Sequence, residues 1–100
     1  MSERAERGPS LENLGALIRE GRVATEGLWG APDDSAGRHQ VGALLAQIRA
    51  DAVVLGQKAM VPVCDSVSPL ANAAPTPQAI EILLGGIHQL EKLWHKAQAQ

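Results

Sequence analysis

A chain of 100 residues allows one domain with a single modest core, which buries somewhat over ~60% of the surface that the unfolded chain exposes. Nine Lys and Arg against eleven Asp and Glu give a net charge of -2, and the chain has two Trp but no Tyr or Phe. We therefore expect no nucleic-acid partner, because both a basic surface and aromatic side chains that stack on bases are missing.

The apolar stretches of the sequence and its single cysteine predict the cellular compartment of the protein. Residues 1–10 are polar and mixed in charge, without the apolar stretch of a secretion signal. No apolar run approaches the ~20 residues that cross a bilayer. The single cysteine, Cys64, cannot form an internal disulfide, which is typical of a reducing compartment. We expect a soluble, cytoplasmic protein that does not associate with membranes.

The first half of the chain predicts two helices. Apolar residues recur at helical spacing over residues 10–28, and Ser10 is a plausible N-cap ahead of Glu12. A turn follows, in which Asp33, Asp34 or Ser35 can cap a second helix over residues 36–55. Gly56 then ends this helix as a C′ glycine.

The second half predicts two more helices. A helix over residues 60–71 places Pro62 in the first turn, where its missing N–H has no partner in any case. The last helix covers residues 76–97, with Thr76 as cap and Pro77 as first helical residue. Its interior contains Gly85-Gly86, which costs ~2 kcal/mol in helix propensity. Either a neighbouring backbone approaches closely there or the pair is simply tolerated.

Four helices joined by short turns predict an all-α fold, an antiparallel up-down four-helix bundle. The bundle occupies residues 10–100 as a single domain, preceded by a flexible N-terminal segment at residues 1–9. No strand pattern and no internal repeat is visible.

The second predicted helix has two contrasting faces. At about 100° per residue, its core face is branched and consists of Val41, Leu44, Leu45, Ile48, Ala52 and Leu55. On or towards the opposite side lie the small or short residues Gly42, Ala43, Ala46, Ala50 and Val53. A solvated helix face normally carries long, charged side chains, so this one is a candidate recognition surface.

Few side chains in the sequence suggest a metal-binding, redox or catalytic site. His88, Glu91 and His95 share one face of the last helix, but a metal site in a bundle needs further ligands from facing helices, and a solvated polar face explains them better. Cys64 falls on an apolar stripe, which favours a core role over a redox role. Asp33-Asp34 is better explained by capping than by cation binding. We expect no metal and no cofactor.

Residues 46–56 read Ala-Gln-Ile-Arg-Ala-Asp-Ala-Val-Val-Leu-Gly. This stretch resembles the second-helix motif of the histidine-phosphotransfer domain family, His-x-Leu-Lys-Gly-x-Ala-x-x-Leu-Gly, found also in the phosphotransfer domain of the chemotaxis histidine kinase. Aligned on the final Leu-Gly, Arg49 stands at the Lys position and Ala50 at the Gly position. The likeness extends over residues 36–94 and includes Met60, Cys64 and Val67 in the third helix.

The chain departs from the family where the phosphorylated histidine should be, because Ala46 occupies that position. Alanine cannot carry a phosphoryl group. The resemblance therefore implies a non-catalytic docking module in two-component phosphorelay signalling, whose partner is a response-regulator receiver domain or a histidine kinase. The expected partner-binding residues are Gly42, Ala43, Ala46, Gln47, Arg49, Ala50 and Val53.

Two alternatives remain at this stage. An active phosphotransferase would use another histidine, first His39 and then His88. His39 lies seven residues before Ala46, hence on the same face but ~10 Å away along the axis. The other alternative is a helical assembly module, in which the small face packs inside a homodimer.

Overall fold

The computed structural model describes residues 10–31, 34–72 and 76–99 of the chain. These residues form four helices and no strand, namely α2 (Leu11–Gly27), α3 (Ser35–Val54), α4 (Met60–Ala71) and α5 (Pro77–Ala99). The predicted all-α four-helix fold is confirmed, with helix ends that differ from the predicted ones by at most two residues. The expected flexible segment at residues 1–9 and the candidate cap Asp33 lie outside the described residues.

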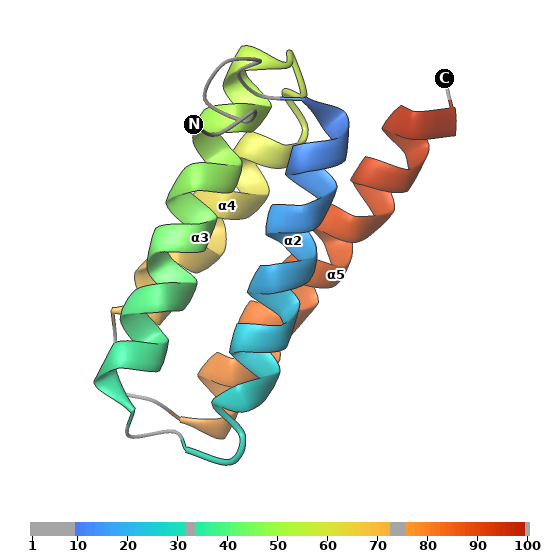
Figure 1. The fold of residues 1–100 in the computed structure, drawn as a ribbon. Coiled ribbons are helices and arrows are strands. Elements are labelled where there is room, and N and C mark those ends of the chain that lie inside the picture. Colours follow the sequence, from blue (N-terminus) through green and yellow to red (C-terminus); the bar gives the residue numbers. More distant parts are fainter. Residues whose placement is uncertain (1–9, 32–33, 73–75, 100) are drawn as a thin grey trace, which may run out of the picture.

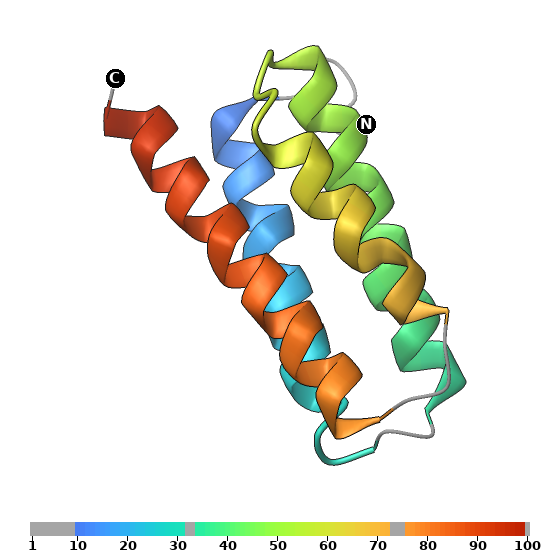
Figure 2. The ribbon, with the colours of Figure 1, turned by 180° about the vertical axis from the view of Figure 1, so that it is seen from behind.

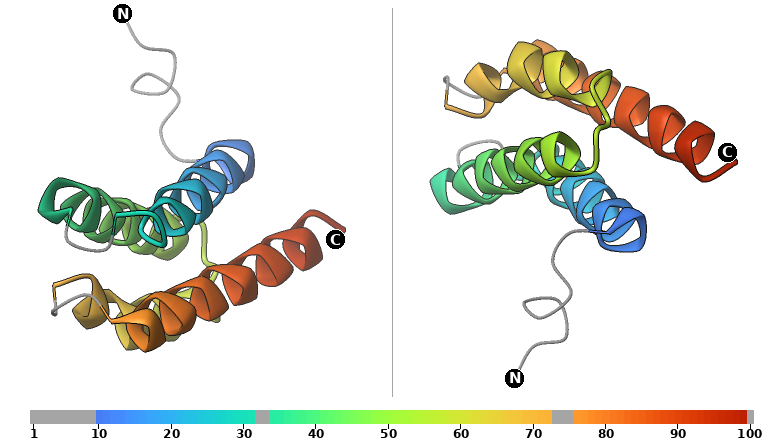
Figure 3. Two further views of the ribbon diagram at one scale, coloured as in Figure 1. Left: turned by 90° about the horizontal axis from the view of Figure 1, so that it is seen from below. Right: turned by 90° about the horizontal axis from the view of Figure 1, so that it is seen from above.

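The helices form a bundle in which chain direction alternates from one helix to the next (Figure 1). Seen along the bundle, α2 and α3 make one layer and α4 and α5 the other (Figure 3). Helix α2 packs against α3 and α5, and α4 packs against the same two helices. Helices α3 and α5 therefore lie diagonally, and one long side of α3 is left without a neighbouring helix.

The core is built from the faces that the apolar periodicity predicts. Val41, Leu45, Ile48 and Ala52 of α3 are fully buried, and they meet apolar residues from the other three helices. These partners include Leu14, Ile18, Met60, Cys64, Ile80, Leu83, Ile87 and Leu90. Burial of this face fixes the rotation of α3 and so decides which of its residues point to solvent.

Three of the predicted helix ends have the expected cap. The hydroxyl of Ser10 accepts a hydrogen bond from the Asn13 N–H at 3.1 Å, and that of Thr76 accepts one from the Ala79 N–H at 3.0 Å. Gly56 has a φ of 72°, which suits glycine, and the Gln57 N–H donates to the Ala52 carbonyl at 2.8 Å. By contrast, Asp34 occupies the N-cap of α3 without a side-chain hydrogen bond.

Two glycines permit close approach between helices. The indole of Trp94 lies where a Cβ on Gly15 would be, and its Nε1 donates to the Leu11 carbonyl at 2.6 Å. At the α4–α5 contact, a Cβ on Gly86 would lie 2.7 Å from Cγ1 of Val67, whereas one on Gly85 would meet nothing within 4 Å. No neighbouring backbone is what Gly86 accommodates: the atoms that a Cβ there would meet all belong to the side chain of Val67, whereas Gly85 is simply tolerated.

The C-terminal turns of α5 diverge from the other three helices (Figure 2). The Trp94 contact with the start of α2 and an ion pair one turn earlier, between Arg22 and Glu91 at 2.9 Å, connect this part of α5 to the bundle. Among the described residues, no helix combines the length and apolar character needed to cross a bilayer.

Candidate docking surface

The side of α3 that faces away from the core is exposed and nearly bare. Ala43, Ala46 and Ala50 are exposed, and Val53 has 56% of its surface accessible. Ala46, the residue aligned with the phosphorylated histidine of the resembled family, lies near the middle of this side. Gly42 lies at its edge, where it is half-buried and a Cβ would lie 3.6 Å from that of Ala71.

The exposed residues of this side form a regular seam. His39, Ala43, Ala46, Ala50 and Val53 are all exposed and follow one another at intervals of four, three, four and three residues. An interval that averages 3.5 residues keeps positions in line with a second helix that crosses at a small angle of ~20°. Small side chains also let two helix backbones come close. We call these five residues the α3 seam; its spacing and size fit a helix as the packing element.

The polar residues beside the seam are already bonded within the protein. Gln47 Nε2 donates to Oδ1 of Asp51 at 2.8 Å, and Arg49 Nε donates to Oδ1 of Asp65 on α4 at 2.7 Å. The second pair is an ion pair whose side chains are 47% and 55% exposed. Asp65 was not a predicted site residue, since nothing in the sequence pairs positions on two different helices. It holds the guanidinium across the α3–α4 junction.

The candidate phosphoacceptors lie at different places. His39 is exposed and begins the α3 seam, in the first turns of α3. His88 is exposed on α5, the helix diagonal to α3. The structure therefore brings His39, but not His88, onto the side of α3 that carries Ala46.

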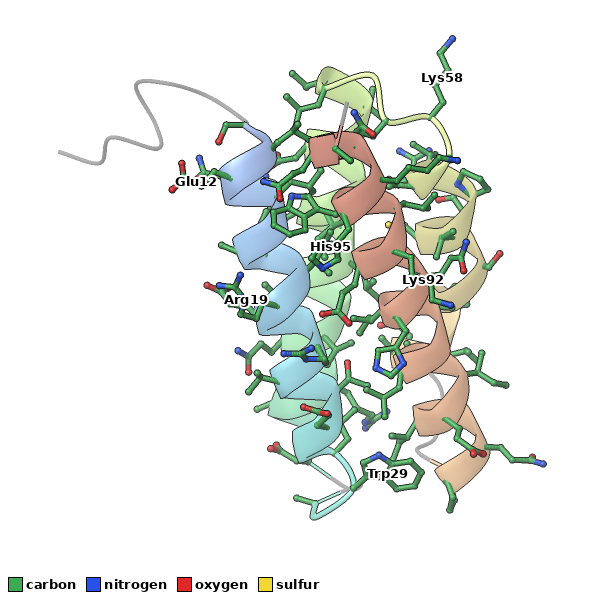
Figure 4. The ribbon with its side chains drawn as sticks, turned by 90° about the vertical axis from the view of Figure 1, so that its right-hand side faces the viewer. Glu12, Arg19, Trp29, Lys58, Lys92 and His95 are labelled. Carbon is green, nitrogen blue, oxygen red and sulfur yellow. The ribbon has the colours of Figure 1, made fainter. Side chains whose placement is uncertain are left out.

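The residues His88, Glu91 and His95 on α5, which were considered and disfavoured as metal ligands from the sequence, do not form a cluster. The Glu91 carboxylate pairs with Arg22, and the His95 ring meets the Trp94 ring edge-on at 5.0 Å between centroids. Figure 4 shows His95 on α5, on the side near α2. In the part of the chain that the structure describes, no three His, Cys, Asp or Glu residues are grouped so that they could hold a metal ion.

Cys64 is a core residue. Its side chain is fully buried, and burial together with the charge of Asp65 raises the pKa of the thiol from 9.0 to about 11. A neutral, buried thiol is a poor nucleophile. The structure thus gives Cys64 a packing role, as the apolar stripe predicted.

An apolar hollow lies at the end of the α3 seam, and sequence reasoning missed it. It has a volume of about 360 Å³ and is lined by Ala52, Val53, Gly56, Lys58, Val61 and Pro62. We call it the α3–α4 hollow. Only Val53 belonged to the predicted surface, because the other residues come together only when the turn at Gly56 brings the first turn of α4 beside the last turn of α3. The apolar pair Val53-Val54 at the end of α3 was the one signal in the sequence.

The α3 seam thus contains no nucleophile except His39. Comparison with known proteins adds no family to this description. No protein-family model matches the chain, and neither a curated protein nor a solved structure matches it.

Proposed function

We propose that this chain is a non-catalytic docking module of the histidine-phosphotransfer type, which binds a response-regulator receiver domain or a histidine kinase domain through the α3 seam. The observation that supports this function is the exposed seam itself, with Ala46 near its centre. A receiver domain or kinase that approached this position would find a small, neutral surface in place of a phosphoacceptor.

The surroundings of Ala46 fit recognition without reaction. Ala50 leaves room on one side, and Asp65 anchors the guanidinium of Arg49 at 2.7 Å while about half of the Arg49 side chain remains exposed. An anchored, exposed guanidinium suits contact with a carboxylate of a partner, because less side-chain freedom is lost on binding. In the cell such a module would occupy the docking surface of a receiver or kinase and withhold it from phosphotransfer.

The function is tested by binding and by phosphate labelling. Purified protein is offered kinase cores and phosphorylated receiver domains from the organism that encodes it. We expect at least one domain to bind, with affinity reduced about tenfold or more by Ala46→Arg or Ala50→Glu. Gln89→Arg is the control, since Gln89 is exposed on the diagonal helix α5. If neither seam substitution weakens any interaction, the docking surface is wrongly placed.

Phosphate labelling distinguishes a docking module from an active phosphotransferase. We expect no acid-labile phosphate on the wild type. Label that is lost in His39→Ala or His88→Ala would identify an active phosphotransferase and overturn the non-catalytic function. In the opposite direction, Ala46→His restores a nucleophile at the centre of the seam, and acid-labile phosphate on this variant would show that Arg49 and Ala50 still frame a competent site. A folded but unlabelled variant would limit the family resemblance to architecture.

Self-association through the same seam is distinguished by sedimentation. A homodimer that Ala46→Arg converts to monomer, without binding to any receiver or kinase domain, would make the protein an assembly module instead.

A further inference from the structure

The C-terminal part of α5 contributes little to the core. The fully buried residues of this helix end at Leu90, and beyond it Leu93 and Trp94 are only half-buried. In this region the helix diverges from the other three (Figure 2). We call residues 91–99 the α5 arm. It is the part of α5 that is least supported by apolar contacts with the bundle.

A cavity lies between the α5 arm and the start of α4. It has a volume of about 190 Å³, and its lining comprises Gln57, Ala59 and Met60 on one side and Leu93, Lys96 and Ala97 on the arm. A cavity of this kind means that the arm is not closely packed on α4, since protein interiors leave few voids larger than a water molecule. Met60 is only 1% exposed although it lines this cavity, so the arm is part of what covers it.

The arm is joined to α2 instead. Among the described residues, one ion pair lies at its base, between Glu91 and Arg22 at 2.9 Å. One turn further, the indole of Trp94 occupies the space beside Gly15 and donates to the Leu11 carbonyl at 2.6 Å. Glycine inside a helix costs about 1 kcal/mol in propensity, and here its missing side chain provides the seat of the indole. That seat can be changed without changing the arm.

We infer that the α5 arm is a latch, which opens while the rest of the bundle stays folded, is held closed by Trp94 on Gly15, and uncovers Met60 when it opens. Opening breaks one indole hydrogen bond, one partly exposed ion pair and the half-buried contacts of Leu93 and Trp94. The helix up to Leu90 stays in the core. Regions with few buried apolar contacts open at a lower free energy than the whole protein unfolds. The latch is independent of the proposed function, since it involves α2, α4 and α5 and not the α3 seam.

The test measures how fast a thiol reagent labels two buried positions of α4, each as the single cysteine in a Cys64→Ala background. Met60→Cys lies under the arm, whereas Val67→Cys lies further along α4, opposite Gly86, and reports unfolding of the bundle. We expect Met60→Cys to be labelled about tenfold faster or more. Its rate should depend weakly on low urea concentrations, because opening the arm exposes little surface, and that of Val67→Cys should depend on them steeply.

Two glycine substitutions in α2 test the seat of Trp94. Gly15→Ala places a methyl group where the indole lies, so labelling of Met60→Cys should become about tenfold faster. Gly27→Ala is the matched control, since a Cβ there would meet nothing within 4 Å. It should leave the labelling rate of Met60→Cys unchanged.

Three outcomes of the labelling experiment would overturn the latch. Equal rates at the two cysteines, with the same steep urea dependence, would mean that only global unfolding uncovers Met60. Faster labelling of Met60→Cys in an Ile80→Val variant would mean the same, because Ile80 stays buried when only the arm opens. Equal effects of Gly15→Ala and Gly27→Ala would show that Trp94 does not hold the arm closed.

Hydrogen exchange tests the latch without any change in α4, and it decides if Met60→Cys does not fold. Once detached, an arm of this length is too short to stay helical in water, so its backbone amides exchange when it opens. Exchange at residues 94–97 should be about tenfold faster in Gly15→Ala than in the wild type and unchanged in Gly27→Ala. Ordinary fraying of a helix end is insensitive to Gly15, so equal exchange in the two variants would refute the latch.

Discussion

Alanine substitutions at the adjacent glycines of α5 test how closely α4 and α5 approach. Gly85 and Gly86 lie in the middle of the same helix, so replacing either by Ala gains about 1 kcal/mol of helix propensity. At Gly85 the new Cβ enters open space, and the gain is kept. At Gly86 the Cβ would lie 2.7 Å from Cγ1 of Val67, a β-branched residue with little rotamer freedom.

The expected magnitudes follow from these two contacts. Overpacking of this kind costs ~1–3 kcal/mol, so Gly86→Ala should be about as stable as the wild type or up to ~2 kcal/mol less stable. The propensity gain is common to both variants and cancels in their difference. The free energy of unfolding of Gly85→Ala should therefore exceed that of Gly86→Ala by ~1–3 kcal/mol. Gly85→Ala should also melt ~4–8 °C above the wild type.

Urea and thermal unfolding followed by far-ultraviolet circular dichroism measure this difference. In a Val67→Ala background the overlap disappears, and Gly86→Ala should become stabilising there, which gives a coupling energy of ~1–3 kcal/mol in the double-mutant cycle. Equal melting temperatures for Gly85→Ala and Gly86→Ala, or a coupling energy near zero, would refute the close approach of α4 and α5 at this point.

Three further predictions concern single side chains. The pKa of the Cys64 thiol is raised from 9.0 to about 11 in the folded state, so the unfolded chain loses its thiol proton first and the free energy of unfolding falls as pH rises between these values. Urea unfolding of Cys64→Ala across this pH interval should lack that fall. Parallel pH profiles for the variant and the wild type would contradict the prediction. Arg49→Gln removes an exposed ion pair and should cost no more than ~1 kcal/mol in urea unfolding; a larger loss would contradict the assignment of this pair as an ordinary surface ion pair. Trp94→Phe removes the indole donor to Leu11 and should cost ~1 kcal/mol, whereas the exposed Trp29, changed to Phe, should stay within ~0.5 kcal/mol.

Helix positions were largely readable from the sequence because their signals are local. Ser10 and Thr76 cap helices through hydroxyl groups that act three residues away, and Gly56 ends α3 through its own φ. The core face of α3 was likewise predicted, because burial follows the 3.6-residue period of the same helix. The side left exposed, with Ala46 on it, is the complement of that face.

Contacts between residues of two different helices could not be predicted from the sequence in this way. The role of Gly86 depends on Val67 of another helix, and the pairing of Arg49 with Asp65 depends on the rotation of both α3 and α4. Neither relation leaves a periodic trace, since residues 16 or 19 positions apart meet only after the helices pack.

The sequence by itself thus determined four helices, three of their caps and the face of small residues on α3 that contains Ala46. Tertiary structure alone decided what lies beside that seam. Packing of α4 against α3 anchors Arg49, and the turn at Gly56 opens a hollow whose walls come from two helices and whose one charge is Lys58. The physical reason is that helix formation depends on neighbours within a turn, whereas the surroundings of this seam are assembled from side chains that only the folded chain brings together.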